Sequence, residues 1–233
     1  MKKILLAFLI ISTYYVSNSQ SRLGYGAEGY ANVRLLKMSG SDFTKNNNSG
    51  VPYKSNLGSF DVGIKYSVLG NLIFRDTDNK FFIGEFVDVG LGVAFYQPVA
   101  LNLQLGWGLA SSYRFTKDIE IGVRYTHIKI DGFFDGALNP GFVQKKTIAP
   151  SVRLKNLMFT AGVGQAFTVV QAGHKGICFM AEGRYLFDPN DDECKYLGFK
   201  IENYNGKGAE GSGSTGKLNG FFIGITAGIM VIN

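Results

Sequence analysis

Apolar and polar side chains alternate without interruption through residues 101–115, "LNLQLGWGLASSYRF". Leucine or an aromatic residue occupies most odd positions, whereas small, amide or charged residues occupy the even ones. A period of two places successive side chains on opposite faces of a β-strand. The stretch is longer than the usual five or six residues of a soluble strand, and it matches a tilted bilayer crossing of about 9–11 residues. It therefore predicts a membrane-crossing strand with one apolar and one polar face.

The same alternation recurs along the chain and predicts ten strands. The other segments begin at Tyr25, Phe60, Val87, Ile119, Ile148, Leu157, Phe179, Leu197 and Phe221. The connections alternate in length. The long polar ones are 38–56, 131–145 and 205–217, and the short ones are 76–80, 116–118, 155–156 and 188–194. Short turns on one side and longer loops on the other are typical of transmembrane barrels. Two connections on the long side, near 97–99 and 170–176, are short, so eight strands is an alternative.

The first residues have the pattern of an export signal. Lys2 and Lys3 precede an apolar core, Ile4 to Ile11, that is too short to span a bilayer, and small residues follow at 17–19. We expect cleavage after Ser19, which divides the chain into a signal peptide, 1–19, and one barrel domain, 20–233. No later segment reaches the 18 or so apolar residues of a spanning helix, so any crossing must be made by strands.

Closure of the sheet follows from the chemistry of lipid. A bilayer offers no hydrogen-bond partners, so a sheet within it can have no open edge. The predicted fold is therefore an all-β, closed antiparallel transmembrane β-barrel of about ten strands. Its apolar face would contact acyl chains and its polar face would line the lumen. The alternative is a soluble β-sandwich or lipocalin-like barrel, which would need its charged face outward and a dry core inside.

Charged residues on the polar face are the main candidate functional residues. A porin selective for one ion sign would show an excess of one charge, but acids and bases are nearly balanced here. Desolvated charges must be paired, so we predict a lumen ion-pair network that mostly closes the barrel. Its members are Glu28, Arg34, Asp61, Lys65, Asp88, Arg114, Glu120, Arg124, Arg153, Glu182, Arg184, Lys200 and Glu202. Glycines on the same face either leave a cavity or relieve crowding in a tightly curved sheet.

The signal peptide, the alternating strands and the rhythm of the loops resemble small outer-membrane β-barrel proteins of the OmpA/OmpX/OmpW type, including the PorT-like barrels of Bacteroidota. The resemblance covers residues 22–233 and rests on pattern, without a diagnostic motif. The chain departs from it by ending in "IMVIN", where such barrels often end in an aromatic residue. The resemblance implies an outer-membrane location, and the PorT-like type implies an accessory role in a secretion machinery.

Three motifs resemble chemical sites but lack essential groups. "GSGSTGK", 211–217, is followed by Leu218 and a strand, where a phosphate-binding loop needs Ser or Thr and a helix. "DPNDDE", 188–193, has Phe199 where a calcium loop needs a bidentate Glu. "RYTHIKID", 124–131, resembles barrel lipid A deacylases at His127, but Lys129 replaces the nucleophile. We therefore predict no catalytic residue, cofactor or metal, and an interfacial His127 beside a lipid-phosphate-binding Lys129.

Cys178 and Cys194 form an even pair in an oxidising compartment, which favours a disulfide. The predicted hairpin places them at opposite ends, about ten residues or roughly 30 Å apart. A bridge needs Cα atoms within about 7 Å. We therefore predict that the two thiols are not bridged.

These observations favour a non-enzymatic barrel that is structural or binds partners through its extracellular loops. Phe133, Phe134 and Phe142 are the candidate loop contacts, with folding back over the barrel mouth as the alternative. A small-solute channel is the second function class, and an accessory barrel of a secretion machinery is the third. The expected partners are outer-membrane lipid and other envelope proteins. Nucleic acid is not expected, because the formal charge of +6 is mild, dispersed and partly due to the two signal lysines.

Overall fold

The computed structural model describes residues 24–39, 56–75, 80–95, 100–134, 143–168, 175–190, 193–207 and 217–232. These residues form ten β-strands. The strands are β1 (Gly24–Ser39), β2 (Asn56–Arg75), β3 (Phe81–Phe95), β4 (Ala100–Thr116), β5 (Ile119–Phe134), β6 (Val143–Leu154), β7 (Leu157–Thr168), β8 (Lys175–Phe187), β9 (Glu193–Lys207) and β10 (Lys217–Ile232). The described residues contain no helix with the length and apolar character needed to cross a membrane. The predicted signal peptide lies outside the described residues.

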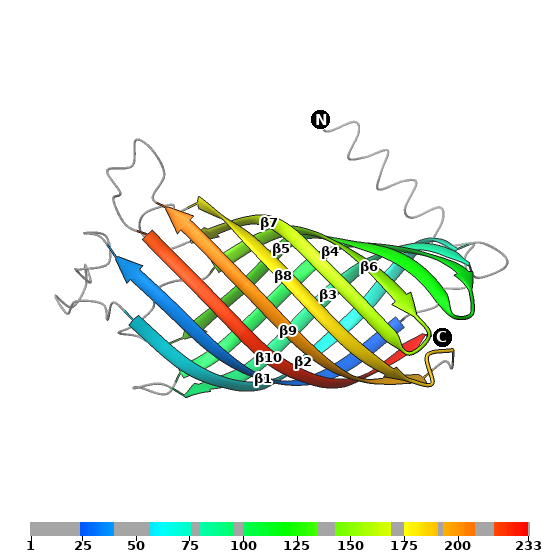
Figure 1. Ribbon diagram of the computed structural model, residues 1–233, viewed down its shortest axis with the longest axis horizontal. Coiled ribbons are helices and arrows are strands. Elements are labelled where there is room, and N and C mark those ends of the chain that lie inside the picture. Colours follow the sequence, from blue (N-terminus) through cyan, green and yellow to red (C-terminus); the bar gives the residue numbers. More distant parts are fainter. Residues whose placement is uncertain are drawn as a thin grey trace.

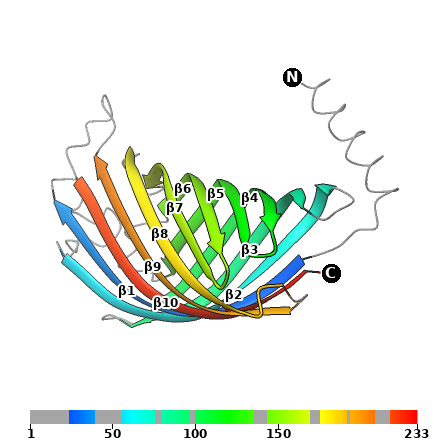
Figure 2. The ribbon, with the colours of Figure 1, turned by 45° about the vertical axis from the view of Figure 1, so that its right-hand side comes forward.

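The ten strands form one closed barrel. Each strand pairs antiparallel with the next along the chain, and β10 pairs with β1 to close the ring (Figures 1 and 2). The prediction of an all-β, closed antiparallel barrel is confirmed, with ten strands and not eight. Because Gly24 of β1 pairs with Ile232 of β10, both ends of the barrel sequence lie at one rim, which we call the terminal end. The opposite rim, where β1 leads into β2 and β5 into β6, is the loop end.

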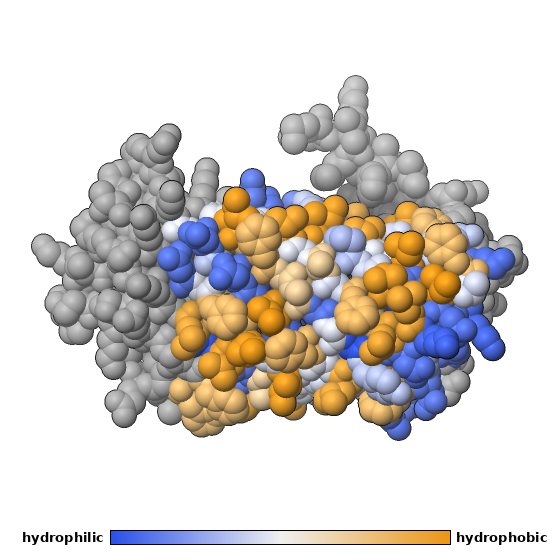
Figure 3. All heavy atoms as spheres, in the orientation of Figure 1, coloured by the Kyte–Doolittle hydropathy of each residue, from blue (hydrophilic) through white to orange (hydrophobic). Residues whose placement is uncertain are grey.

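The apolar residues of the alternating sequence lie on the outer face of the barrel, and the polar residues lie on its inner face. Leu101 of β4 is 60% exposed, whereas its neighbour Asn102 is 0% exposed, the reverse of what a soluble domain shows. The same exposure of large apolar side chains extends around all ten strands. Figure 3 shows these apolar residues across the middle of one face, with hydrophilic residues gathered toward the two ends. The barrel therefore presents an apolar belt outward and encloses its polar residues.

Aromatic side chains pair on the outer face near the terminal end. The rings of Tyr113 and Phe115 in β4 meet edge to face at 4.8 Å between centroids, and those of Tyr185 and Phe187 in β8 do so at 5.0 Å. All four side chains are exposed. Girdles of this kind border the apolar band of transmembrane barrels.

A bulge in β5 interrupts the alternation and corrects one prediction. Thr126 pairs with Gly108 of β4, but Ile128 pairs with Trp107, so His127 is the additional residue. A one-residue insertion exchanges the two faces of everything that follows it. Lys129 accordingly lies in register with the buried Gly106, on a different row from His127. The sequence pattern predicts His127 and Lys129 on one face, because the alternation of apolar and polar residues does not reveal a bulge.

β5 also extends further than the sequence predicted. It continues to Phe134, so Phe133 and Phe134 belong to a strand, in register with Asn102 and Leu101 of β4, and not to a loop starting at 131. Phe142 lies outside the described residues. β6 begins at Val143, two residues before the predicted loop ends.

The buried side chains inside the barrel are mostly polar, with one small apolar cluster. Leu186, Cys194 and Tyr196 pack together near the terminal end, with Met158 and Met230 against them. Within the described strands, Cys178 and Cys194 are both buried and do not form a disulfide, as predicted from their positions on β8 and β9.

Candidate functional site in the barrel lumen

The inward faces of β1, β2 and β4 hold a buried charged group. Asp61 of β2 is fully buried and accepts a hydrogen bond from Nε of Arg34 at 2.9 Å, and Nη2 of the same arginine lies 2.9 Å from the same carboxylate oxygen. Asn102 of β4 donates from Nδ2 to the same carboxylate oxygen at 3.5 Å. A buried charge is tolerated when it is paired and hydrogen-bonded. One carboxylate thus joins β1, β2 and β4, of which β2 and β4 are separated by β3.

Lys145 of β6 makes a contact that crosses the lumen. Its side chain is 2% exposed, and Nζ forms an ion pair with Glu202 of β9, two strands beyond its nearest neighbour. Glu202 is also 3.1 Å from Nζ of Lys200. The ring of Phe222 of β10 receives two cations, Lys145 at 4.9 Å and Arg34 at 4.6 Å from its centroid. These contacts connect β1 to β6 through the interior of the barrel.

A second group surrounds Glu28 of β1. Its carboxylate is 2.7 Å from Nζ of Lys65 and 3.5 Å from Nη2 of Arg184, and it accepts a hydrogen bond from the Tyr196 hydroxyl at 2.6 Å. Arg184 also donates from Nε to Glu182 at 2.5 Å and lies 4.4 Å above the ring of Tyr196. The group joins β1, β2, β8 and β9, so it too reaches across the interior.

Two further groups complete the network. Arg124 of β5 pairs with Asp88 of β3 and stacks 3.5 Å from the ring centroid of Phe86. These residues come from alternate strands, with β4 between them.

Near the terminal end, Glu120 lies between two arginines, 3.4 Å from Nε of Arg114 and 3.5 Å from Nη2 of Arg153. Arg153 also donates to the carbonyl oxygens of Lys155 and Lys117, at 3.2 and 3.1 Å. Lys155 and Lys117 lie in different turns. One arginine therefore ties two turns of the terminal end together.

Every charged residue of the predicted lumen network lies in one of these groups. The sequence does not predict Lys145 as a member, because its pattern places 131–145 in a loop. The signal was present: Lys145, Thr147, Ala149 and Arg153 occupy the buried odd positions of one strand. Tyr196 and Phe222 were also missed as partners, since periodicity identifies a face and not a contact.

Aromatic side chains fill the space beside the inward glycines. A Cβ at Gly63 or Gly92 would collide with the Tyr30 hydroxyl, and one at Gly228 would lie 2.7 Å from the ring of Tyr196. At Gly108 the same atom would lie 2.9 Å from Phe86. Of the two roles considered for these glycines, relief of crowding is the one that the packing supports.

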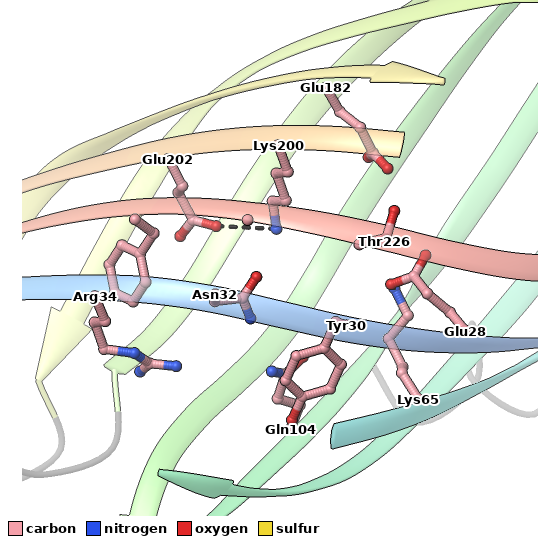
Figure 4. A pocket seen from close by; sticks show the side chains of 12 residues that line it. Glu28, Tyr30, Asn32, Arg34, Lys65, Gln104, Glu182, Lys200, Glu202 and Thr226 are labelled. Atoms are coloured by element: carbon pink, nitrogen blue, oxygen red, sulfur yellow. Dashed lines mark ion pairs between the residues drawn. The ribbon is translucent and has the colours of Figure 1, made fainter. Parts of the chain in front are cut away.

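A polar cavity of about 60 Å³ lies among these groups, enough for a few water molecules. Figure 4 shows its side chains converging from strands around the barrel. Its lining comprises Glu28, Tyr30, Asn32, Arg34, Lys65, Gln104, Glu182, Lys200, Glu202, Phe222, Gly224 and Thr226. In the part of the chain that the structure describes, no three His, Cys, Asp or Glu side chains are grouped as metal ligands.

No protein-family model and no curated protein sequence matches the chain. Several solved outer-membrane barrels are similar to it at low scores. The Pseudomonas putida toluene transporter TodX is 9% identical, with 94% of this chain and 91% of that chain covered and a TM-score of 0.34. The translocator domain of the autotransporter NalP from Neisseria meningitidis is 7% identical, with 97% and 95% covered and a TM-score of 0.32. A Pseudomonas aeruginosa FadL homologue is 8% identical, with 91% and 90% covered and a TM-score of 0.31. At these scores we draw neither substrate nor activity from the likeness.

Proposed function

We propose that this protein is an integral outer-membrane β-barrel with a closed lumen and no enzymatic activity, which acts as a structural or partner-binding element through its loop end. The apolar belt supports the membrane location. In water, an exposed apolar surface that encircles the molecule would aggregate. Acyl chains would solvate the same surface, and the closed ring satisfies the backbone hydrogen bonds that lipid cannot.

The cross-lumen contact of Lys145 with Glu202 over Phe222 carries the proposal of a closed barrel. A diffusion channel needs a continuous path, whereas here a buried ion pair and an aromatic ring occupy the interior between β6 and β10. The Glu28 group spans the interior a second time. Each of the six acids in these groups pairs with at least one of the eight bases. The excess of two positive charges is therefore held in ion pairs and does not form the ring of like charges that selects ions in a channel.

Electrical recording in planar bilayers tests the closed lumen. We expect the full barrel to insert without stable conductance steps. The double variant Lys145→Ala/Phe222→Ala removes both the cation and the ring, and we expect small openings from it if it folds. Stable openings of the unmodified protein would contradict the proposal and favour the small-solute channel, for which the polar cavity would be the starting point.

The membrane location has a separate test. We expect the protein to fractionate with the outer membrane and to run faster on a gel before boiling than after it, as closed barrels resist unfolding by detergent. A protein that is soluble without detergent would overturn the location.

Partner binding is proposed for the connections between strands at the loop end. Phe142, which lies outside the described residues, is our first candidate for it. Phe142→Ser should leave the gel shift unchanged while reducing co-purification of an envelope partner after mild extraction.

A further inference from the structure

The outer surface carries a polar patch interrupting the apolar belt on four neighbouring strands. It consists of Trp107 of β4, Tyr125 and His127 of β5, Lys146 of β6 and Gln165 of β7. Lys146 pairs with Gln165, and the bulge puts His127 and Ile128 opposite Lys146, because Thr126 pairs with Thr147 and Lys129 with Lys145. Directly opposite side chains on one face of a sheet have Cβ atoms about 5 Å apart. The register therefore brings the imidazole, the ammonium group and the amide together.

The orientation of Lys146 follows from its neighbours. Lys145 and Thr147 are buried on the lumen side, whereas Ile148, the next residue on the face of Lys146, is 50% exposed. Lys146 has no ion-pair partner among the residues that the structure describes. Lys195, another outward lysine, is 3.7 Å from Glu193. Lys146 lies three residues inside the loop end of β6, and Gln165 lies three residues before the end of β7. On β6, Lys146 is thus a cation on the loop-end side of the exposed Ile148, without an ion-pair partner in the described part of the chain.

The bulge also orients His127. Its ring packs edge to face on Trp107, with 5.1 Å between centroids, and its Nδ1 is 3.4 Å from the Tyr125 hydroxyl. If this hydroxyl donates to Nδ1, the ring proton is on Nε2, which has no hydrogen-bond partner within the described strands. The patch therefore offers three kinds of donor: an ammonium, an imidazole N–H and an amide.

We propose that this patch binds the phosphate group of an anionic lipid headgroup, with Lys146 and His127 as its main donors. This inference rests on the proposed membrane location. The surroundings favour lipid as the ligand, because the patch lies on the barrel wall beside the apolar belt and not inside the lumen. A cation at such a border extends toward the headgroup region, where phosphate supplies the opposite charge. Lys129 is excluded from this role, since the bulge moves it to the row of Gly106.

Trp107 is the single tryptophan of the chain and touches His127, so its fluorescence reports on the patch directly. The full protein is placed in phosphatidylcholine nanodiscs and titrated with bisphosphorylated lipid A, with the same lipid after removal of its phosphates, or with inorganic phosphate. We expect a saturable change with the phosphorylated lipid alone. Lys146→Gln should weaken it about fivefold, the effect of removing one basic residue near a lipid surface. The matched control Lys129→Gln should leave it unchanged.

Three results would overturn the inference: an equal response to the dephosphorylated lipid, an equal response to inorganic phosphate, or equal effects of Lys146→Gln and Lys129→Gln. Heat-dependent gel migration of the same samples separates this inference from the proposed function. A barrel that inserts and shifts on the gel but ignores phosphate contradicts the patch alone. A protein that never inserts contradicts the membrane location.

Discussion

Lys145 and Lys146 are adjacent in the sequence and lie in opposite surroundings. Lys145 is buried in the lumen, where it pairs with Glu202 and contacts Phe222. Lys146 is on the outer wall, without an ion-pair partner among the described residues. The chemical group is the same, and only the face of the strand differs. Inside the barrel, the charge of Lys145 is neutralised by another side chain of the chain, whereas the charge of Lys146 must be neutralised by the surroundings.

The largest expected effect comes from breaking a buried pair on the inner face. Asp61→Ala leaves Arg34 buried without its carboxylate, and we expect the free energy of unfolding to fall by about 3–5 kcal/mol. Urea unfolding of the barrel in detergent or vesicles measures it. The double variant Arg34→Met/Asp61→Leu removes both charges and should recover most of the loss. A single variant as stable as the unmodified protein would show that the pair is solvated and the lumen open.

A charge placed on the outer face should lower the free energy of unfolding slightly less than Asp61→Ala does. Ile225 lies halfway along β10 and is 58% exposed. Ile225→Arg is expected to lower the free energy of unfolding from vesicles by about 2–4 kcal/mol, because the guanidinium would enter the hydrocarbon region. Phe187→Arg, at the rim of β8, is the matched control and should cost at most about 1 kcal/mol. Equal costs at the two positions would mean that no apolar medium surrounds the belt.

Substitutions of glycine by alanine compare the packing of the inner and outer faces, with smaller expected changes in the free energy of unfolding. A Cβ at the buried Gly206 would collide with the ring and hydroxyl of Tyr204, whereas at the outward Gly183 the nearest atoms, in Phe159, are 3.9 Å away. We expect Gly206→Ala to lower the free energy of unfolding by about 1–3 kcal/mol through overpacking. Gly183→Ala should be neutral or slightly stabilising, since glycine is a poor strand residue. A tolerated Gly206→Ala would indicate a lumen with spare room.

Much of the fold and most members of the lumen ion-pair network could be predicted from the sequence. The alternation of apolar and polar residues is a local property of each strand and does not depend on its neighbours. The period of two in residues 101–115 assigned Leu101 outward and Asn102 inward without knowledge of any partner strand. The same rule found both members of the pair Arg34 and Asp61. It could not find the contact partners Tyr196 and Phe222, since they depend on which strands meet across the interior.

The sequence by itself determined that this chain has one apolar and one polar face on each strand, and hence a closed barrel with a charged interior. Only the tertiary structure decided the register, because register depends on hydrogen bonds between strands distant along the chain. It placed the bulge at His127, which moved Lys129 away from the histidine and brought Lys146 beside it. It also extended β6 to include Lys145, whose partner Glu202 is 57 residues away in sequence. Local periodicity carries no information on such pairings, since each strand alternates in the same way whichever neighbour it meets.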